Sequence, residues 1–135
     1  MKYSFKFDLG CFPTTVHVMF GYDTLDEVID KYELNAEYFE FEPDDDDDCL
    51  ALTLFSYNKG NCYLLFKDIV TNMDDMVSIV HEITHAVGNI FKYYDTPLND
   101  DTSEVYAYTA GYIFSTVMKE VEKKQGIKIV CQKKK

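Results

Sequence analysis

Residues 72–91 constrain the fold most strongly, because this stretch has the pattern of one long amphipathic helix. Apolar side chains recur in it every three or four residues, and neither Gly nor Pro occurs between Asn72 and Ala86. Asn72 is a suitable N-cap, and Asp75 occupies the third helical position. The apolar face predicted for this helix comprises Met76, Ile79, Val80, Ile83, Val87, Ile90 and Phe91.

Two pairs of strand-like segments come before this helix. Apolar and polar residues alternate over most of residues 3–20, which predicts a first hairpin. Residues 50–57 and 61–67 lie on either side of a turn signal that ends at Gly60, and they predict a second hairpin.

Two further helices complete the predicted order of elements. A short helix over residues 24–32 follows the first hairpin, and a longer one begins near Asp101 or Thr102 and is ended by Gly126. The order of hairpin, helix, hairpin and two long helices indicates an α+β fold. We expect residues 1–135 to form a single domain, in which a small antiparallel or mixed sheet packs on the two long helices.

The charge of the chain argues against nucleic-acid binding. The formal net charge is −11, and such a surface repels a phosphate backbone. The consecutive acidic residues Asp44–Asp48 lack the Gly and Glu positions of a calcium-binding loop. We expect the acidic loop at residues 42–48 and the tail at residues 132–135 to be mobile.

The sequence favours a reducing compartment and no membrane. No apolar run is long enough to cross a bilayer, and residues 1–10 lack the continuous apolar block of a signal peptide. No CxxC pair occurs among Cys11, Cys49, Cys62 and Cys131. We therefore expect a cytoplasmic protein whose thiols are free and buried.

The sequence HEITH at residues 81–85 carries a specific chemical signal. Residues four apart lie on one face of a helix, so His81 and His85 can direct two imidazole nitrogens at one zinc ion, about 2.0–2.1 Å away. Glu82 is rotated by about 100° from His81 and would border the metal rather than bind it. From there it can take a proton from a zinc-bound water, whose pKa the metal lowers to about 7. This is the H-E-x-x-H pattern of metalloproteases.

Two histidines on an apolar helix also have a structural interpretation, as core rings satisfied by backbone carbonyls. Burying polar groups costs free energy, so two polar rings one turn apart in an apolar stripe need a reason, and this favours the metal site. The remaining histidine, His17, shares the outward side of its strand with Thr15 and Met19, and we expect it on the surface. Catalytic zinc usually has three protein ligands, so the third must be a carboxylate or a cysteine.

Glu104 is the first candidate for the third ligand. It lies 104 − 85 = 19 positions after His85, which is enough chain to end one helix and bring the next back beside the metal. It would project from a rigid helix, and the small residues Ala107, Ala110 and Gly111 would let that helix approach the motif helix closely.

Three alternatives for Glu104 remain open. Asp101 as N-cap with Glu104 three residues later is close to a capping box, which would give Glu104 a purely local role. Asp100 or Asp101 could themselves be ligands, and the site could also lack a third protein ligand.

HEITH followed by a helix-borne glutamate in SEVYAY resembles the zincin metallopeptidases, in particular the gluzincin branch typified by thermolysin. The resemblance implies that His81, His85 and Glu104 bind zinc and that Glu82 is the general base. The chain is also similar to small stand-alone HExxH proteins common in bacteriophage and prophage genomes, which implies a place in the host cytoplasm. The resemblance is carried by residues 61–115.

Substrate handling is expected to involve a tyrosine and a strand. A tyrosine hydroxyl can donate to an oxyanion, and Tyr108, one turn after Glu104, is the first candidate, followed by Tyr112. Packing is the alternative role for either, because the chain has 11 tyrosines. Zincins hold an extended substrate against an edge strand, and the resemblance gives that place to residues 61–67.

Together these features support the hypothesis of a zinc-dependent hydrolase that cleaves a peptide bond in a peptide or protein substrate. Only 135 − 85 = 50 residues follow His85, so the cleft should be shallow, or completed by a partner chain or a second copy. One rival is a weak or inactive zincin-like protein with a structural or interaction role, against which Glu82 argues, because a structural site needs no base. A second rival is hydrolysis of a non-peptide amide.

Overall fold

The structure is a computed structural model that describes residues 1–34 and 51–128. The α+β composition and both hairpins predicted from the sequence are confirmed. The acidic loop at residues 42–48, the tail at residues 132–135, Cys49 and Cys131 lie outside the described residues. In chain order the elements are β1 (Tyr3–Asp8), β2 (Thr15–Phe20), α1 (Leu25–Tyr32), β3 (Ala51–Ser56), β4 (Asn61–Phe66), α2 (Met73–Tyr93) and α3 (Ser103–Gln125).

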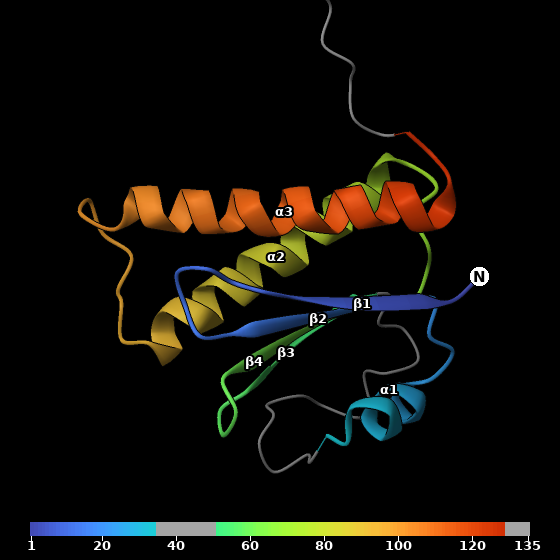
Figure 1. The fold of residues 1–135 in the computed structure, drawn as a ribbon, viewed down its shortest axis with the longest axis horizontal. Helices are drawn as coiled ribbons and strands as arrows, with labels where there is room; N and C mark the ends of the chain where they lie inside the picture. Colours follow the sequence, from blue (N-terminus) through green and yellow to red (C-terminus); the bar gives the residue numbers. More distant parts are fainter. Residues whose placement is uncertain (35–50, 129–135) are drawn as a thin grey trace, which may run out of the picture.

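The four strands of the described residues form one mixed sheet in the order β1-β2-β4-β3 (Figure 1). The two antiparallel hairpins join through the parallel pair β2 and β4, in which Val18 lies opposite Leu64. β4 is therefore an interior strand, and it is buried from Cys62 to Phe66. Its nearly continuous apolar sequence suits a strand that is covered on both faces. The edge strands of the sheet are β1 and β3.

Helices cover both faces of this sheet (Figure 1). On one face, Val18 and Leu64 pack in a core with residues of α2 and α3. On the other face, Met19 and Leu65 pack with Val28 of α1 in a second, smaller core. α2 and α3 therefore share one side of the sheet, and α1 occupies the other.

The second core changes the environment of His17. The sequence predicts a surface position for this residue, beside Met19, but Met19 is only 2% exposed and His17 is half-buried. The His17 ring stacks on Tyr63 with the centroids 4.8 Å apart, and Tyr32 of α1 packs against it at 5.4 Å. The prediction is wrong because an alternating strand pattern cannot show that a helix covers its more polar side.

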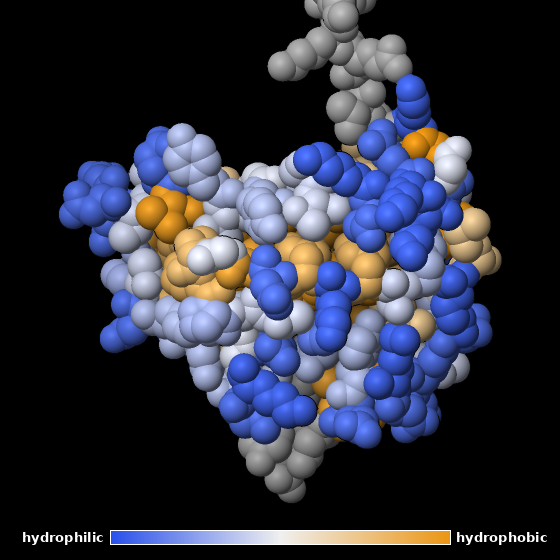
Figure 2. Space-filling view, viewed as in Figure 1, coloured by the Kyte–Doolittle hydropathy of each residue, from blue (hydrophilic) through white to orange (hydrophobic). Residues whose placement is uncertain are grey.

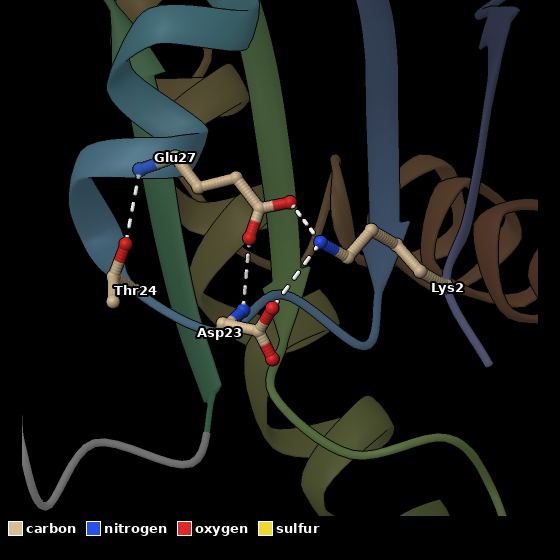
Figure 3. A network of polar contacts seen from close by, with 4 residues as sticks. All are labelled: Lys2, Asp23, Thr24 and Glu27. Atoms are coloured by element: carbon tan, nitrogen blue, oxygen red, sulfur yellow. Dashed lines mark hydrogen bonds and ion pairs between the residues drawn. The ribbon is translucent and has the colours of Figure 1, made fainter.

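A polar network fastens α1 to the N-terminus of the chain (Figure 3). Thr24 is the N-cap of α1, and its hydroxyl accepts a hydrogen bond from the Glu27 N–H at 3.3 Å. The Glu27 carboxylate accepts from the Asp23 N–H at 2.9 Å and pairs with Lys2, which also contacts Asp23 at 3.4 Å. The hydrogen bond from Lys2 lowers the pKa of the Glu27 carboxyl group.

Asn72 is the N-cap of α2 as predicted, and it forms a capping box with Asp75. The Asn72 side chain accepts a hydrogen bond from the Asp75 N–H at 3.0 Å, and the Asp75 carboxylate accepts from the Asn72 N–H at 3.2 Å. The buried face matches the prediction at most positions, but Val80 is 50% exposed, whereas Glu82 is buried. The prediction fails at Val80 because the sheet and α3 cover a narrower stripe of α2 than its apolar residues span.

The last helix, α3, ends as predicted at Gly126, which adopts a left-handed conformation with φ 67°. The N-cap is Thr102, which makes no side-chain cap hydrogen bond, so the alternative capping box between Asp101 and Glu104 is not formed. The predicted close approach through Gly111 is also wrong. Gly111 is exposed, and a Cβ atom there would have no neighbour within 4 Å among the described residues.

Two smaller expectations concern the thiols and the membrane. Cys62 is free and buried as predicted, and burial raises the pKa of its thiol to about 12. Cys11 is also free, but it is exposed. Within the described part of the chain, none of the helices combines the length and the apolar character that a membrane span requires.

Candidate metal centre

The two histidines of the motif lie on the solvent-facing side of α2 and point at one another. Their Nε2 atoms are 3.2 Å apart, and the rings meet edge to face with centroids 4.8 Å apart. The His81 side chain is 65% exposed, so the alternative of two core histidines satisfied by carbonyls does not describe this pair. At this separation one ring can also donate a hydrogen bond to the other, depending on the tautomers.

The separation of the two Nε2 atoms fits one zinc ion. Two ligands about 2.0–2.1 Å from a metal with tetrahedral angles are about 3.3–3.4 Å apart. The observed 3.2 Å is within about 0.2 Å of that edge length. His81 and His85 therefore supply two of the donors that such an ion needs, with no rearrangement of the helix.

Glu82 turns from this pair toward the sheet and is 8% exposed. The hydroxyl of Thr53 on β3 lies 2.8 Å from the Glu82 Oε1 atom and 3.0 Å from the Glu82 carbonyl oxygen, and it can donate to either. The other carboxylate oxygen, Oε2, is 3.9 Å from His81 Nε2. The carboxylate thus borders the histidine pair from the sheet side.

The strand beside this site is β3 rather than β4. The resemblance gives the edge-strand role to residues 61–67, but β4 lies between β2 and β3 in the sheet, so its backbone is paired on both sides. That assignment is wrong because β4 joins β2 in a parallel pair, which the local sequence cannot reveal. The edge strand in contact with Glu82 is β3, through Thr53.

Glu104 is not brought together with the two histidines. On α2, Glu82 faces β3, whereas Phe91, nine residues later and rotated by about 180°, contacts Tyr106 of α3 at 4.9 Å between ring centroids. α3 therefore packs on the flank of α2 opposite Glu82. Glu104 precedes Tyr106 by two residues, about 200° around α3, so it points away from α2 and is exposed.

The aspartates before α3 do not complete the site either. Among residues 1–34 and 51–128, no group of three or more His, Cys, Asp or Glu side chains is arranged to hold a metal ion. Asp100 and Asp101 are exposed in the loop before α3. The donors that the structure assembles are thus His81 and His85, and the three-ligand arrangement with Glu104 is not formed in this conformation.

Both tyrosine candidates lie away from the histidines. Tyr108 is 75% exposed and Tyr112 is 49% exposed. They line a cavity of about 380 Å³ with residues of the β1–β2 turn such as Leu9 and Cys11, in the region where Figure 2 shows apolar surface below the start of α3. Tyr112 also packs edge-on against Phe7 of β1 at 6.1 Å. Tyr108 in this position has no geometry for donating to an oxyanion at the histidine pair.

Thr53 belongs to this site but is not among the residues predicted from the sequence. It pairs with Leu64, which belongs to the core that faces α2, so its hydroxyl occurs on the apolar, helix-facing side of β3. The signal in the sequence is one polar residue in phase with Ala51 and Phe55, where an alternating strand should be apolar.

Comparison with known protein families, with curated proteins and with solved structures finds no match to this chain.

Proposed function

We propose that this chain is a zinc-dependent hydrolase of the zincin type that cleaves peptide bonds. The observation that carries the proposal is the convergence of the His81 and His85 Nε2 atoms at 3.2 Å, with a buried glutamate beside them. A site that only stores or structurally uses zinc needs the two nitrogens but not the glutamate. Glu82 and its Thr53 partner support a site that also moves a proton.

In this proposal His81 and His85 hold the ion. When bound, zinc would supply a Lewis acid that polarises a substrate carbonyl and acidifies water. Glu82 accepts the proton of the attacking water and later passes it to the leaving amine. Thr53 holds one carboxylate oxygen, so that the other, Oε2, faces the histidine pair.

An extended peptide has a natural place along β3. This strand is an edge of the sheet, and Thr53 joins it directly to Glu82. A peptide that adds a strand to such an edge gains main-chain hydrogen bonds without requiring a deep cleft. The exposed histidine pair and the adjoining edge strand together support an open site for a peptide or a flexible protein segment.

The first test is the metal content of protein purified without chelator or nickel resin. We expect about one zinc per chain in the parent and a sharp loss in His85→Ala, because one of two assembled donors is removed. Glu104→Ala is the matched control and should keep its zinc, because this side chain faces away from the pair. Loss of zinc from Glu104→Ala as severe as from His85→Ala would show that Glu104 is a ligand after all.

The second test separates metal binding from chemistry. Glu82→Gln preserves shape but cannot accept a proton, so zinc content should remain while peptide cleavage falls at least about 100-fold. Cleavage can be followed by mass spectrometry of a peptide mixture incubated with the zinc-loaded protein. Unchanged cleavage by Glu82→Gln would show that Glu82 is not the general base.

A zinc-stabilised interaction protein is the second candidate. It is favoured by the open position of the pair and by the lack of a third assembled donor among the described residues. In that case zinc would raise the unfolding temperature of the parent and of Glu82→Gln equally, and neither protein would cleave peptides.

A further inference from the structure

A cavity of about 440 Å³ opens at the C-terminal end of α2, outside the metal centre. Its lining residues come from α2, from the loop between α2 and α3, and from the first turn of α3. They are Gly88, Phe91, Lys92, Asp95, Thr96, Pro97, Leu98 and Tyr106.

The cavity continues the face of α2 that carries the histidines. Gly88 is three residues after His85, and helical residues at this spacing have Cβ positions about 5–6 Å apart. His81, His85, Gly88 and Lys92 are all exposed and follow one another at spacings of four, three and four residues along this face. The cavity therefore begins one helical turn beyond the histidine pair.

Gly88 keeps the entrance of the cavity open. Nothing in the described residues lies closer than 4.0 Å to where a Cβ atom would stand, and that neighbour is the Tyr106 hydroxyl. A helix interior ordinarily disfavours glycine, since it costs about 1 kcal/mol relative to alanine. Neither packing nor backbone conformation requires glycine here, and the missing side chain leaves room beside His85.

The far wall is a loop that folds back over the helix end. The Thr96 N–H donates to the Phe91 carbonyl at 2.8 Å, and the Asp95 N–H donates to the Lys92 carbonyl at 3.2 Å. These are the two hydrogen bonds of a Schellman motif, with Asp95 in the left-handed conformation at φ 56°. The motif sends Pro97 and Leu98 across the last turn of α2 as the wall of the cavity.

The lining selects an uncharged, apolar group. Phe91, Pro97, Leu98 and Tyr106 provide aromatic and aliphatic surface, and Leu98 is 59% exposed, so its apolar area is available. Lys92 and Asp95 carry opposite charges on the lining and give it no net charge. An aliphatic or aromatic side chain gains from burial against these apolar walls.

We propose that this cavity is a specificity pocket that receives an aliphatic or aromatic side chain of the substrate while the adjoining scissile group lies at the histidine pair. The inference rests on the proposed hydrolase function and adds its substrate class. It assigns Gly88 as the residue that admits the side chain and Leu98 as part of the wall that holds it.

Two zinc-binding probes test the pocket by calorimetry on the zinc-loaded protein. Acetohydroxamate carries only the chelating group, whereas 3-phenylpropanohydroxamate adds a phenyl ring that reaches about one helical turn. We expect the phenyl probe to bind the parent at least about tenfold more tightly than acetohydroxamate, because the ring is buried against apolar walls. In Gly88→Val the ratio of the two affinities should fall toward one.

Gly111→Val is the matched control, because Gly111 is another exposed glycine in a helix with open space around it. It should retain the parent ratio. Leu98→Ala changes an exposed loop residue and should lower the ratio several-fold, so the test does not depend on the folding of Gly88→Val. A parent that shows no preference for the phenyl probe, or variants at Gly88 and Leu98 that keep it, would overturn the pocket.

Metal content of the same samples separates the two proposals. Zinc binding and acetohydroxamate binding without a phenyl preference overturn the pocket and leave the hydrolase proposal standing. A parent that binds neither zinc nor acetohydroxamate overturns both.

Discussion

At the scale of single residues, the candidate site depends on a hydrogen bond between a strand and a helix. It joins Thr53 of β3 to Glu82 of α2. Glu82 is 8% exposed, and its Oε1 atom receives the Thr53 hydroxyl at 2.8 Å. A buried acceptor that loses its donor costs more free energy than the hydrogen bond contributes on average. The hydroxyl therefore bears on stability as well as on the orientation of the carboxylate.

Thr53→Val keeps the shape of the side chain and removes this donor. We expect the free energy of unfolding to fall by about 1–3 kcal/mol, measured by urea denaturation. Thr53→Ser retains the hydroxyl and should lose less than Thr53→Val. Equal stability of the parent and Thr53→Val would mean that Glu82 finds another donor.

Gly21 gives a second prediction at this scale. Its φ is 87°, and a Cβ atom would lie 2.3 Å from the Met1 carbonyl oxygen, which is backbone and cannot move aside cheaply. Gly21→Ala should therefore lower the free energy of unfolding by at least about 2 kcal/mol. Gly10→Ala is the control, because nothing in the described residues lies within 4 Å of a Cβ atom there. Similar thermal stability of the two variants would contradict the prediction.

At the scale of elements, local sequence signals were sufficient wherever an element is defined by its own residues. The capping box at Asn72, the left-handed stop at Gly126 and both hairpins follow from short-range chemistry, and the structure has all of them. The two histidines come together for the same reason, because four residues of helix bring their side chains to one face.

The expectations that fail at this scale depend on how elements pack. The edge role given to β4 fails because a parallel pair with β2 buries it, and nothing within residues 61–67 specifies that partner. Glu104 does not join the histidines, because α3 packs against Phe91 and not against the Glu82 side of α2. The number of residues between two positions limits how far apart they can lie. The side of α2 on which α3 packs, however, depends on the whole apolar surface that the two helices and the sheet bury together.

The C-terminus of α2 carries the element-scale prediction. Asp95 occupies the left-handed position of the Schellman motif, where glycine is the usual residue. Asp95→Gly should raise the free energy of unfolding by about 0.5–1 kcal/mol, because the Cβ penalty at this φ is removed. Gly126→Ala at the equivalent position of α3 should change stability in the opposite direction by a similar amount. Both are measured by chemical denaturation, and changes of the same sign would refute the argument.

At the scale of the whole molecule, the sheet separates two cores with different chemistry. The core under α2 and α3 supports the histidine face, and it is lined by apolar residues from every strand. The core under α1 is smaller, and two of its side chains, Tyr63 and Tyr32, pack around the His17 ring. The half-buried His17 ring lies against Tyr32 of α1, so we expect the docking of α1 to depend on pH.

The pKa of His17 is lowered in the folded state, mainly because partial burial disfavours the charged ring. Lys6 of the adjacent strand and Lys59 of the β3–β4 turn act in the same direction, and Asp8 opposes them. The ordinary value is about 6.5, so the unfolded chain takes up a proton before the folded one does. The contribution of the neutral ring to the free energy of unfolding is therefore fully present above about pH 6.5. It is lost as the pH falls from there toward the lowered folded-state pKa.

His17→Gln removes this titration while keeping a polar side chain at the position. Because carboxyl groups elsewhere also titrate on acidification, the informative quantity is the difference between parent and variant in the same buffers. We expect the free energy of unfolding of the parent to decline more steeply than that of His17→Gln between about pH 7.5 and about pH 5, measured by urea denaturation. Parallel pH profiles for the two proteins would mean that the ring is as hydrated in the folded state as in the unfolded chain, and that α1 does not cover it in solution.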